Sequence, residues 1–361
     1  MKKLLSLGLI AAFIGFQGCS TDFEVTGDYT EFSVVYGLLD VNNNPSNGGT
    51  GHNIRVQKAF LGEIDAAIMA STPDSSYFPV EDLMVTLTEY DAEGDAKNHF
   101  VLSDIMIDGK DTTGGYGFFG PDQRVYHTDE NLVGGFDYEL LVHNTHTGYR
   151  DSATVKLLDP EDVRFLAPNA GQSQRITFQP YNPVTEYRPT TFRFNNPLGV
   201  KTGELWLRLH YREMLNSNPG TVTAKFVDLK VAGFTFDDED DLNQFQFALD
   251  GESFYRSVAN ALDPIAGQRT IGLQEHTNGF SDDLQLYVYI GGVDLYDYIS
   301  INAPSTSGAL TDNISYSNMS VGKGMFSSRS QIFNDAFLQL NTVASAELAG
   351  GTFTRDLSFI D

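Results

Sequence analysis

Apolar and polar residues alternate in many short runs after about residue 29, which is the pattern of strands half buried on a sheet. The clearest run lies in residues 204–212. Side chains of a strand point alternately to its two faces, so every second residue of this run shares a face. The residues predicted to face a core are Leu205, Leu207, Leu209 and Tyr211.

The first part of the chain, residues 29–158, contains six or seven such runs separated by turn-forming clusters. Residues 42–49 and 111–115 are two of these clusters, rich in glycine and small polar residues. Short strands at this spacing predict an immunoglobulin-like β-sandwich, although the cysteine and tryptophan landmarks of antibody domains are absent from these residues. The fold class predicted for the whole chain is therefore mainly β.

A second β-rich domain is predicted over residues 175–361. Residues 159–174, rich in proline and acidic side chains, form the predicted linker to it. In residues 251–262 the strand pattern stops, and Phe254 and Val258 recur at helical spacing. The second domain is therefore expected to contain one short helix.

Strands are also predicted later in the second domain. Residues 284–290 and 295–302 both alternate and are expected to form two strands joined by a turn. Residues 322–324, with the sequence Gly-Lys-Gly, predict a further tight turn rather than a phosphate-binding loop, because the other glycines of such a loop are missing.

The amino terminus has the organisation of an export signal. Two lysines precede a continuous apolar run over residues 4–16, which is too short to span a bilayer permanently. The only cysteine of the chain, Cys19, follows this run after Gln17 and Gly18. We predict that residues 1–18 are a lipoprotein signal peptide and that the mature chain is acylated on Cys19, which would hold it in outer-membrane lipid.

The match to a lipoprotein cleavage site is incomplete. Phe16 and Gln17 occupy positions where a leucine and a small residue are usual, so an ordinary secretory signal is the alternative. Residues 19–28 form an acidic tether that resembles the export signals of some surface lipoproteins. A tether without such an address is equally compatible with the sequence. The predicted location is the outer membrane, with the cell-surface side favoured over the periplasmic side.

Composition limits the partners. The 361 residues include 23 basic and 48 acidic side chains, for a net charge of −25. Because the two lysines of the signal would be removed, the mature chain would carry −27. A chain this acidic repels nucleic acid, so no nucleic-acid partner is expected. A single cysteine excludes an intramolecular disulfide.

Four stretches carry a resemblance to known proteins. They are similar to a family of Gram-negative envelope lipoproteins with a domain of unknown function, often associated with TonB-dependent outer-membrane receptors. The resemblance implies a two-part, β-rich accessory protein and a possible TonB-dependent receptor partner, and it transfers no catalytic residue. The stretches are residues 34–39, residues 54–62, Phe254 with Tyr255, and residues 318–329.

The main candidate for a metal site is one acidic run. Asp237, Asp238 and Asp240 lie within five consecutive carboxylates, and Ca²⁺ prefers several oxygen ligands. The run lacks the spacing of an EF-hand loop, so a solvated acidic turn is the favoured interpretation. No cofactor is expected, and calcium at this run is the alternative.

The polar side of residues 204–212 is the candidate ligand surface. Aromatic stacking and charge-assisted hydrogen bonds there would suit an anionic or sugar ligand. The alternative is that these side chains pair with acidic residues on neighbouring strands. The four residues of this surface are Trp206, Arg208, His210 and Arg212.

These features favour a lipid-anchored binding or accessory module, with a role in nutrient uptake beside an outer-membrane receptor. No catalytic motif is found, so the protein is not expected to be an enzyme. A structural or adhesion lipoprotein and a hydrolase with a loop-built site are the alternatives.

Overall fold

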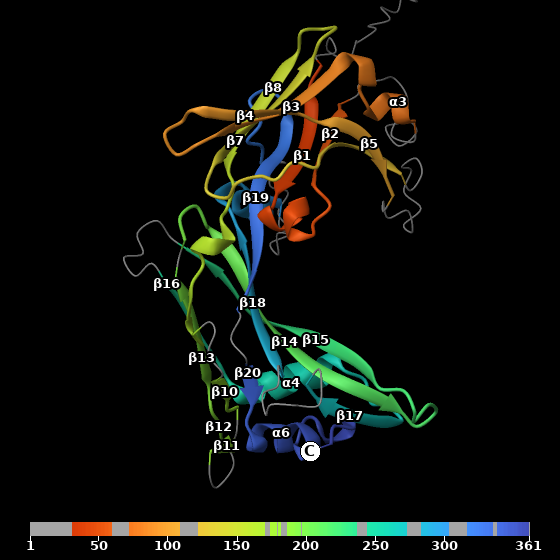
Figure 1. Ribbon diagram of the computed structural model, residues 1–361, viewed down its shortest axis with the longest axis vertical. Coiled ribbons are helices and arrows are strands. Elements are labelled where there is room, and N and C mark those ends of the chain that lie inside the picture. Colours follow the sequence, from red (N-terminus) through yellow and green to blue (C-terminus); the bar gives the residue numbers. More distant parts are fainter. Residues whose placement is uncertain are drawn as a thin grey trace, which may run out of the picture.

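The protein is mainly β, as the sequence predicts. The computed structural model in Figure 1 shows two β-rich units joined by long strands. The predicted signal peptide, Cys19 and the predicted tether lie outside the residues that the structure describes. These residues are 31–59, 72–108, 122–169, 174–178, 180–181, 186–195, 197–236, 244–272, 283–302, 316–334 and 338–360.

The first unit contains two sheets around one core. In one sheet the strand order is β19-β1-β2-β6-β5, and in the other it is β4-β3-β7-β8. Residues of both sheets, including Val35, Leu87 and Leu140, form a single hydrophobic cluster. The strands are β1 (Ser33–Leu39), β2 (His52–Lys58), β3 (Leu83–Tyr90), β4 (Ala96–Val101), β5 (Ser103–Ile107), β6 (Gln123–Thr128), β7 (Asp137–Asn144), β8 (Arg150–Lys156) and β19 (Lys323–Phe333).

The second unit surrounds the long hairpin of β14 (Thr202–Leu215) and β15 (Thr223–Thr235). β14 also pairs with β17 and β18, and β18 pairs with β19 and β20. A small sheet, β16-β13-β9, stands apart from this large sheet. The further strands are β9 (Phe165–Ala167), β10 (Gln174–Ile176), β11 (Pro180–Tyr181), β12 (Glu186–Tyr187), β13 (Thr190–Asn195), β16 (Gln244–Leu249), β17 (Gly267–Ile271), β18 (Leu284–Gly291) and β20 (Leu338–Leu340).

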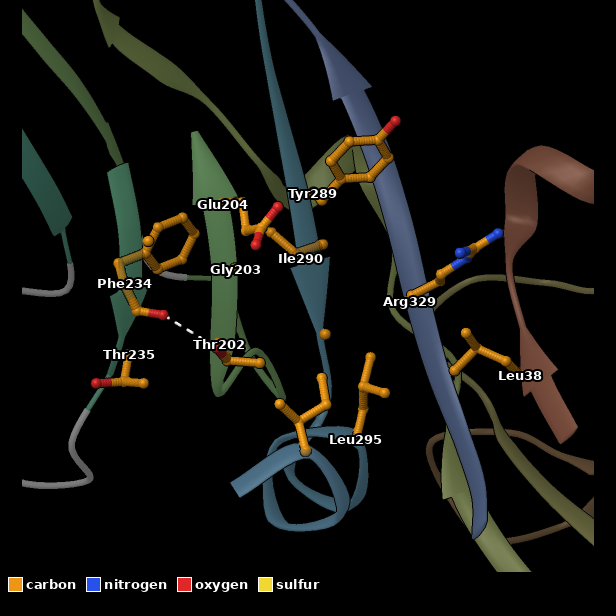
Figure 2. Close-up of a pocket in the computed structure, with 13 residues that line it drawn as sticks. Leu38, Thr202, Gly203, Glu204, Phe234, Thr235, Tyr289, Ile290, Leu295 and Arg329 are labelled. Carbon is orange, nitrogen blue, oxygen red and sulfur yellow. Dashed lines mark hydrogen bonds between the residues drawn. The ribbon is translucent and has the colours of Figure 1, made fainter. Parts of the chain in front are cut away.

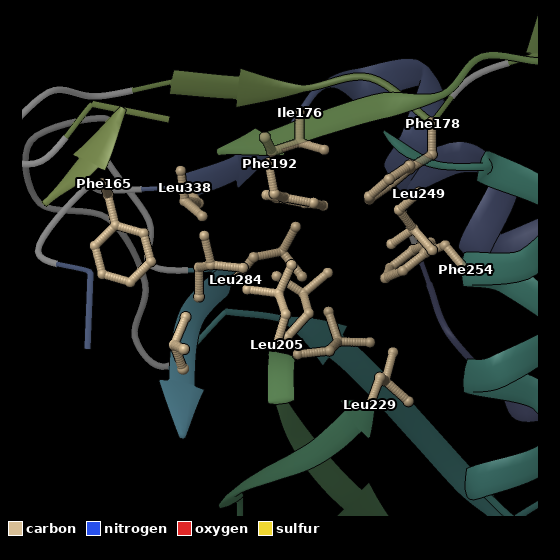
Figure 3. Packing of buried hydrophobic residues seen from close by; sticks show 14 of the residues in the cluster. Phe165, Ile176, Phe178, Phe192, Leu205, Leu229, Leu249, Phe254, Leu284 and Leu338 are labelled. Carbon is tan, nitrogen blue, oxygen red and sulfur yellow. The ribbon is translucent and has the colours of Figure 1, made fainter. Parts of the chain in front are cut away.

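The second core lies on one face of the β14 sheet (Figure 3). Leu205 and Leu284 from this sheet pack in one cluster with Phe192 of β13 and Phe254 of a helix. The four apolar residues that alternate along β14 are all buried, which confirms their predicted orientation. Phe165, inside the segment predicted to be a linker, is also part of this cluster.

The helix predicted near residues 251–262 is confirmed as α4 (Gly251–Ala261). The carboxylate of Asp250 caps it by accepting a hydrogen bond from the backbone N–H of Ser253 at 3.1 Å. Phe254 and Val258 are buried, as their spacing predicts. The other α-helices of the described residues are α3 (Pro73–Ser76), α5 (Val293–Asn302) and α6 (Thr342–Gly350). The expectation of a single helix in the second domain is therefore wrong, since α5 and α6 also lie within residues 175–361.

Helix α5 lies where a strand is predicted from residue 295 onward, so that prediction is wrong. The apolar residues of this segment fit both a two-residue and a four-residue spacing, and contacts with distant strands decide between them. The backbone N–H of Leu295 donates to the hydroxyl of Ser327 on β19 at 3.1 Å. The ring of Tyr298 meets the ring of Tyr36 on β1 edge to face, with centroids 6.0 Å apart.

Strand β19 connects the two units. Its first half pairs with β1 in parallel, and its second half pairs with β18 in antiparallel orientation. The tight turn predicted at residues 322–324 is wrong, since β19 begins at Lys323. Gly324 has φ +120°, and a Cβ there would collide with the carbonyl oxygen of Val35. The glycine is therefore needed for the close approach of β19 to β1.

Replacing Gly324 with alanine is expected to lower the free energy of unfolding by roughly 2–3 kcal/mol, because the new residue is strained at a positive φ. Chemical denaturation monitored by circular dichroism measures this change. Gly350→Ala is the matched control, because a Cβ at Gly350 meets no atom within 4 Å. Equal stability of the two variants would contradict the role given to Gly324.

Candidate functional site

The large sheet carries an aromatic surface on the face opposite the second core. In register, Trp206 on β14 lies beside Tyr287 on β18, and Tyr287 lies beside Phe333 on β19. Sequence-distant strands therefore bring several rings together on one face. We call this surface the aromatic face and define it by Trp206, Phe226, Tyr287, Tyr289 and Phe333.

Tyr287 is the centre of the aromatic face and is only 2% exposed. The rings of Trp206 and Tyr287 have centroids 6.2 Å apart and planes within 13°. Phe333 lies 5.3 Å from Tyr287, and Tyr289 stands nearly perpendicular to it at 5.6 Å. The buried ring thus supports outer rings that are partly open to solvent, with Tyr289 37% and Phe333 40% exposed.

Arg208 and Lys230, two cations beside the aromatic face, are already paired. Arg208 donates from Nε and one terminal nitrogen to the two carboxylate oxygens of Asp228, at 2.7 and 2.9 Å. Lys230 forms an ion pair with Glu204. The other oxygen of Glu204 accepts a hydrogen bond from the indole N–H of Trp206 at 3.0 Å. The sequence left open that the polar residues of β14 pair with acids on neighbouring strands. Arg208 does so with Asp228.

The pKa values of Tyr287 and Arg208 are both raised, so Tyr287 stays neutral and Arg208 stays charged near neutral pH. Burial raises the pKa of Tyr287 above its ordinary value, and the charge of Asp228 acts in the same direction. Hydrogen bonding to Asp228 raises the pKa of Arg208. The guanidinium of Arg208 also lies over the ring of Phe226, 3.9 Å from its centroid.

The other two predicted ligand residues lie further along β14. His210 is buried and contacts the ring of Phe226 edge to face at 6.4 Å. Arg212 is half buried, and its Nε makes no hydrogen bond with the part of the chain that the structure describes. The structure thus places all four predicted residues on one side of β14, with Trp206 and Arg208 among the partly exposed rings.

A pocket of about 580 Å³ opens beside the aromatic face, where the two units meet (Figure 2). Helix α5 forms one wall, β14 and β15 form another, and Leu38 of β1 and Arg329 of β19 complete it. Its volume is that of a small-molecule site. The apolar residues that line it are Leu38, Phe234, Ile290, Leu295 and Ile299.

Glycines line the hollow where β14, β15 and β18 run side by side. Gly203, Gly233 and Gly291 come from these three neighbouring strands. A Cβ at Gly203 would collide with the ring of Phe234 and the carbonyl oxygen of Tyr289. A Cβ at Gly233 would instead project into open space, with its nearest neighbour 3.9 Å away. The missing side chain at Gly233 therefore contributes open space to the pocket, whereas the ring of Phe234 fills the space beside Gly203.

The pocket and the aromatic face are continuous. Glu204 and Tyr289 line the pocket, and they also contact residues of the aromatic face. The hydroxyl of Tyr289 accepts a hydrogen bond from Gln331 at 3.1 Å, which holds the ring at this boundary. One extended ligand can therefore contact both surfaces.

The predicted calcium ligands Asp237, Asp238 and Asp240 lie outside the described residues. Within the described ranges, no three histidine, cysteine or acidic side chains are grouped so that they could hold a metal ion. Among these same residues, no helix is both long and apolar enough to cross a bilayer.

Sequence reasoning found one strand of the site and missed the pocket. The alternation along β14 identifies Trp206 and Arg208, but Tyr287 and Phe333 join them only through strand pairing. The tyrosines of β18 are visible in the sequence as a cluster, which is a weak signal for an aromatic surface. Gly203, Gly233 and Gly291 are tens of residues apart, so the sequence does not indicate that they line one pocket.

Comparison with known proteins gives no family: no protein-family model matches the chain, and no curated protein matches it. The geometry of the site is therefore the basis for the function proposed below.

Asp228→Asn is expected to lower the free energy of unfolding by about 1–2 kcal/mol, because it removes a two-point charge-assisted contact with Arg208. Chemical denaturation measures the loss. Glu252→Gln is the control, since Glu252 pairs with Arg256 at an exposed helical position and should change stability by less than about 0.5 kcal/mol. Equal losses would show that the Asp228–Arg208 contact is no stronger than a surface pair.

Proposed function

We propose that the protein is a lipid-anchored, non-catalytic binding module of the outer membrane that binds a saccharide on the aromatic face. Its role would be nutrient uptake beside an outer-membrane receptor of the TonB-dependent kind. The observation that supports a saccharide is the combination of partly exposed rings with charges that already pair among themselves.

The paired charges distinguish between the two ligand classes that the sequence allows. An anionic ligand bound on the exposed rings needs an unpaired cation beside them, but Arg208 and Lys230, the cations next to Trp206, each contact a carboxylate. A neutral sugar places its C–H faces on aromatic rings and exchanges hydrogen bonds with both donors and acceptors. The carboxylates of Glu204 and Asp228 retain lone pairs for such hydroxyl groups. The site therefore supports the sugar over the anion.

The anchor and the location rest on the amino-terminal sequence. An apolar signal ending at the only cysteine supports cleavage before Cys19 and acylation there. The acidic tether supports display on the cell surface.

We also propose that the first unit is an immunoglobulin-like sandwich. Two sheets that enclose one core support this assignment. The hydroxyl of Tyr138, near the start of β7, accepts a hydrogen bond from the backbone N–H of Val133 at 2.7 Å. A tyrosine bonded to the backbone a few residues upstream is a recurrent feature of such sandwiches.

Oligosaccharide binding can be followed directly, because Trp206 is the only tryptophan in the chain. We expect at least one member of a panel of neutral oligosaccharides to shift the tryptophan emission in a saturable titration. Tyr289→Ala should weaken that binding by about tenfold, because it removes a partly exposed stacking ring.

Met106→Ala provides the control for this substitution. Met106 is 56% exposed on β5 of the first unit, away from the aromatic face, so its removal should leave the affinity unchanged. The proposal fails if no oligosaccharide in the panel binds, or if Tyr289→Ala binds as tightly as the wild-type protein.

Acylation predicts a defined amino terminus. Mass spectrometry of the mature protein should find a diacylated or triacylated Cys19, and Cys19→Ser should move the protein out of the membrane fraction. Protease treatment of intact cells should degrade the wild-type protein if it is displayed on the surface. An unmodified Cys19 would contradict the anchor, and full protection from protease would contradict surface display.

A further inference from the structure

We infer that the ligand is an amphiphilic saccharide, whose sugar lies on the aromatic face and whose apolar substituent occupies the pocket between the two units. This inference rests on the proposed function, since the sugar contacts are those of the aromatic face. It adds the chemical class of the group attached to the sugar.

The interior of the pocket favours an apolar substituent. Leu295 of α5 faces it from one side, and Phe234 of β15 lies on the other (Figure 2). Ile299 of α5 also lines it. Gly233 adds no side chain between them. An alkyl or aryl group placed here would be removed from water, which is favourable in proportion to its apolar area.

The polar groups of the pocket favour the same orientation. Glu204 lies at the boundary with the aromatic face and is held there by Trp206 and Lys230. Arg329 is held by Asp40 at 3.3 Å, so its charge is also paired. The sugar therefore finds its polar partners toward Trp206, and the apolar group extends away from them toward Ile299.

Comparison of octyl β-D-glucoside with methyl β-D-glucoside tests the inference. Calorimetric titration of the full-length protein is made below the concentration at which the octyl compound forms micelles. Each buried methylene should strengthen binding by roughly fourfold, so the octyl compound should bind at least about 100-fold more tightly. Octanoate, which has the chain without the sugar, should bind much more weakly than octyl glucoside.

Two variants localise the apolar group. Gly233→Leu should fill the pocket and remove the advantage of the octyl chain, and Ile299→Asp should reduce it by placing a charge on the pocket wall. Gly220→Leu is the matched control, because Gly220 lies in the β14–β15 turn, where a Cβ meets no atom within 4 Å. Thermal unfolding checks that each variant remains folded.

The outcomes separate this inference from the proposed function. Equal binding of the octyl and methyl compounds, an advantage that survives Gly233→Leu, or equal binding of octanoate and octyl glucoside would overturn the amphiphilic ligand. A different result would overturn the sugar assignment of the aromatic face: no oligosaccharide of the panel binds, while octyl glucoside still binds more tightly than methyl glucoside.

A further arm identifies the source of the ligand. The Cys19→Ser protein is used, so that no acyl anchor can hold it on vesicles. If vesicles of phosphatidylcholine and galactosylceramide capture this protein, and Gly233→Leu abolishes the capture, the ligand is a membrane glycolipid. No capture, together with tight binding of octyl glucoside, would support a free amphiphile.

Discussion

The parallel pairing of β1 with β19 is the contact on which the rest of the structure depends. A parallel pair cannot close through a tight turn, and here almost the whole chain lies between the two strands. Phe326 of β19 is fully buried in the core of the first unit, so residues 29–158 do not supply that core alone. The second half of β19 pairs with β18 in the second unit. The pocket exists where it does because Leu38 and Arg329 come from these two paired strands.

The sequence predicts elements whose pattern is local. Strand β14 alternates because one of its faces is buried, and α4 shows helical spacing for the same reason. Helix α5 could not be predicted from local pattern, because its apolar residues fit both strand and helix spacing. Its partners Tyr36 and Ser327 are distant in sequence. The sequence alone does not show that Gly233 opens a pocket, because a missing side chain leaves space only if its neighbours do not fill it. The pairing of Gly233 with Glu204 on β14 identifies those neighbours. Three of the stretches that carry the family resemblance contribute β1, β2 and β19, which are adjacent strands.

The strong acidity of the chain helps to explain why the site is locally balanced. With 48 acidic and 23 basic side chains, carboxylates outnumber the cations available to neutralise them. On the aromatic face this excess leaves Arg208 and Lys230 each beside a carboxylate on a neighbouring strand. Such pairs add little free energy where they are exposed, but they remove the unpaired positive charge that an anionic ligand would need. The proposed preference for a neutral ligand therefore rests on the charge pattern around the exposed rings.

The direction of β1 relates the site to the proposed anchor. β1 enters the fold at Ser33, on the side of the first unit away from the second, and runs toward the junction (Figure 1). Five residues of extended strand separate Ser33 from Leu38 at the pocket, a distance of roughly 17 Å. With Cys19 in a bilayer, the first unit would therefore stand between the membrane and the site. That placement favours a ligand presented from the solvent or by a neighbouring receptor over one drawn from the lipid that surrounds the anchor itself.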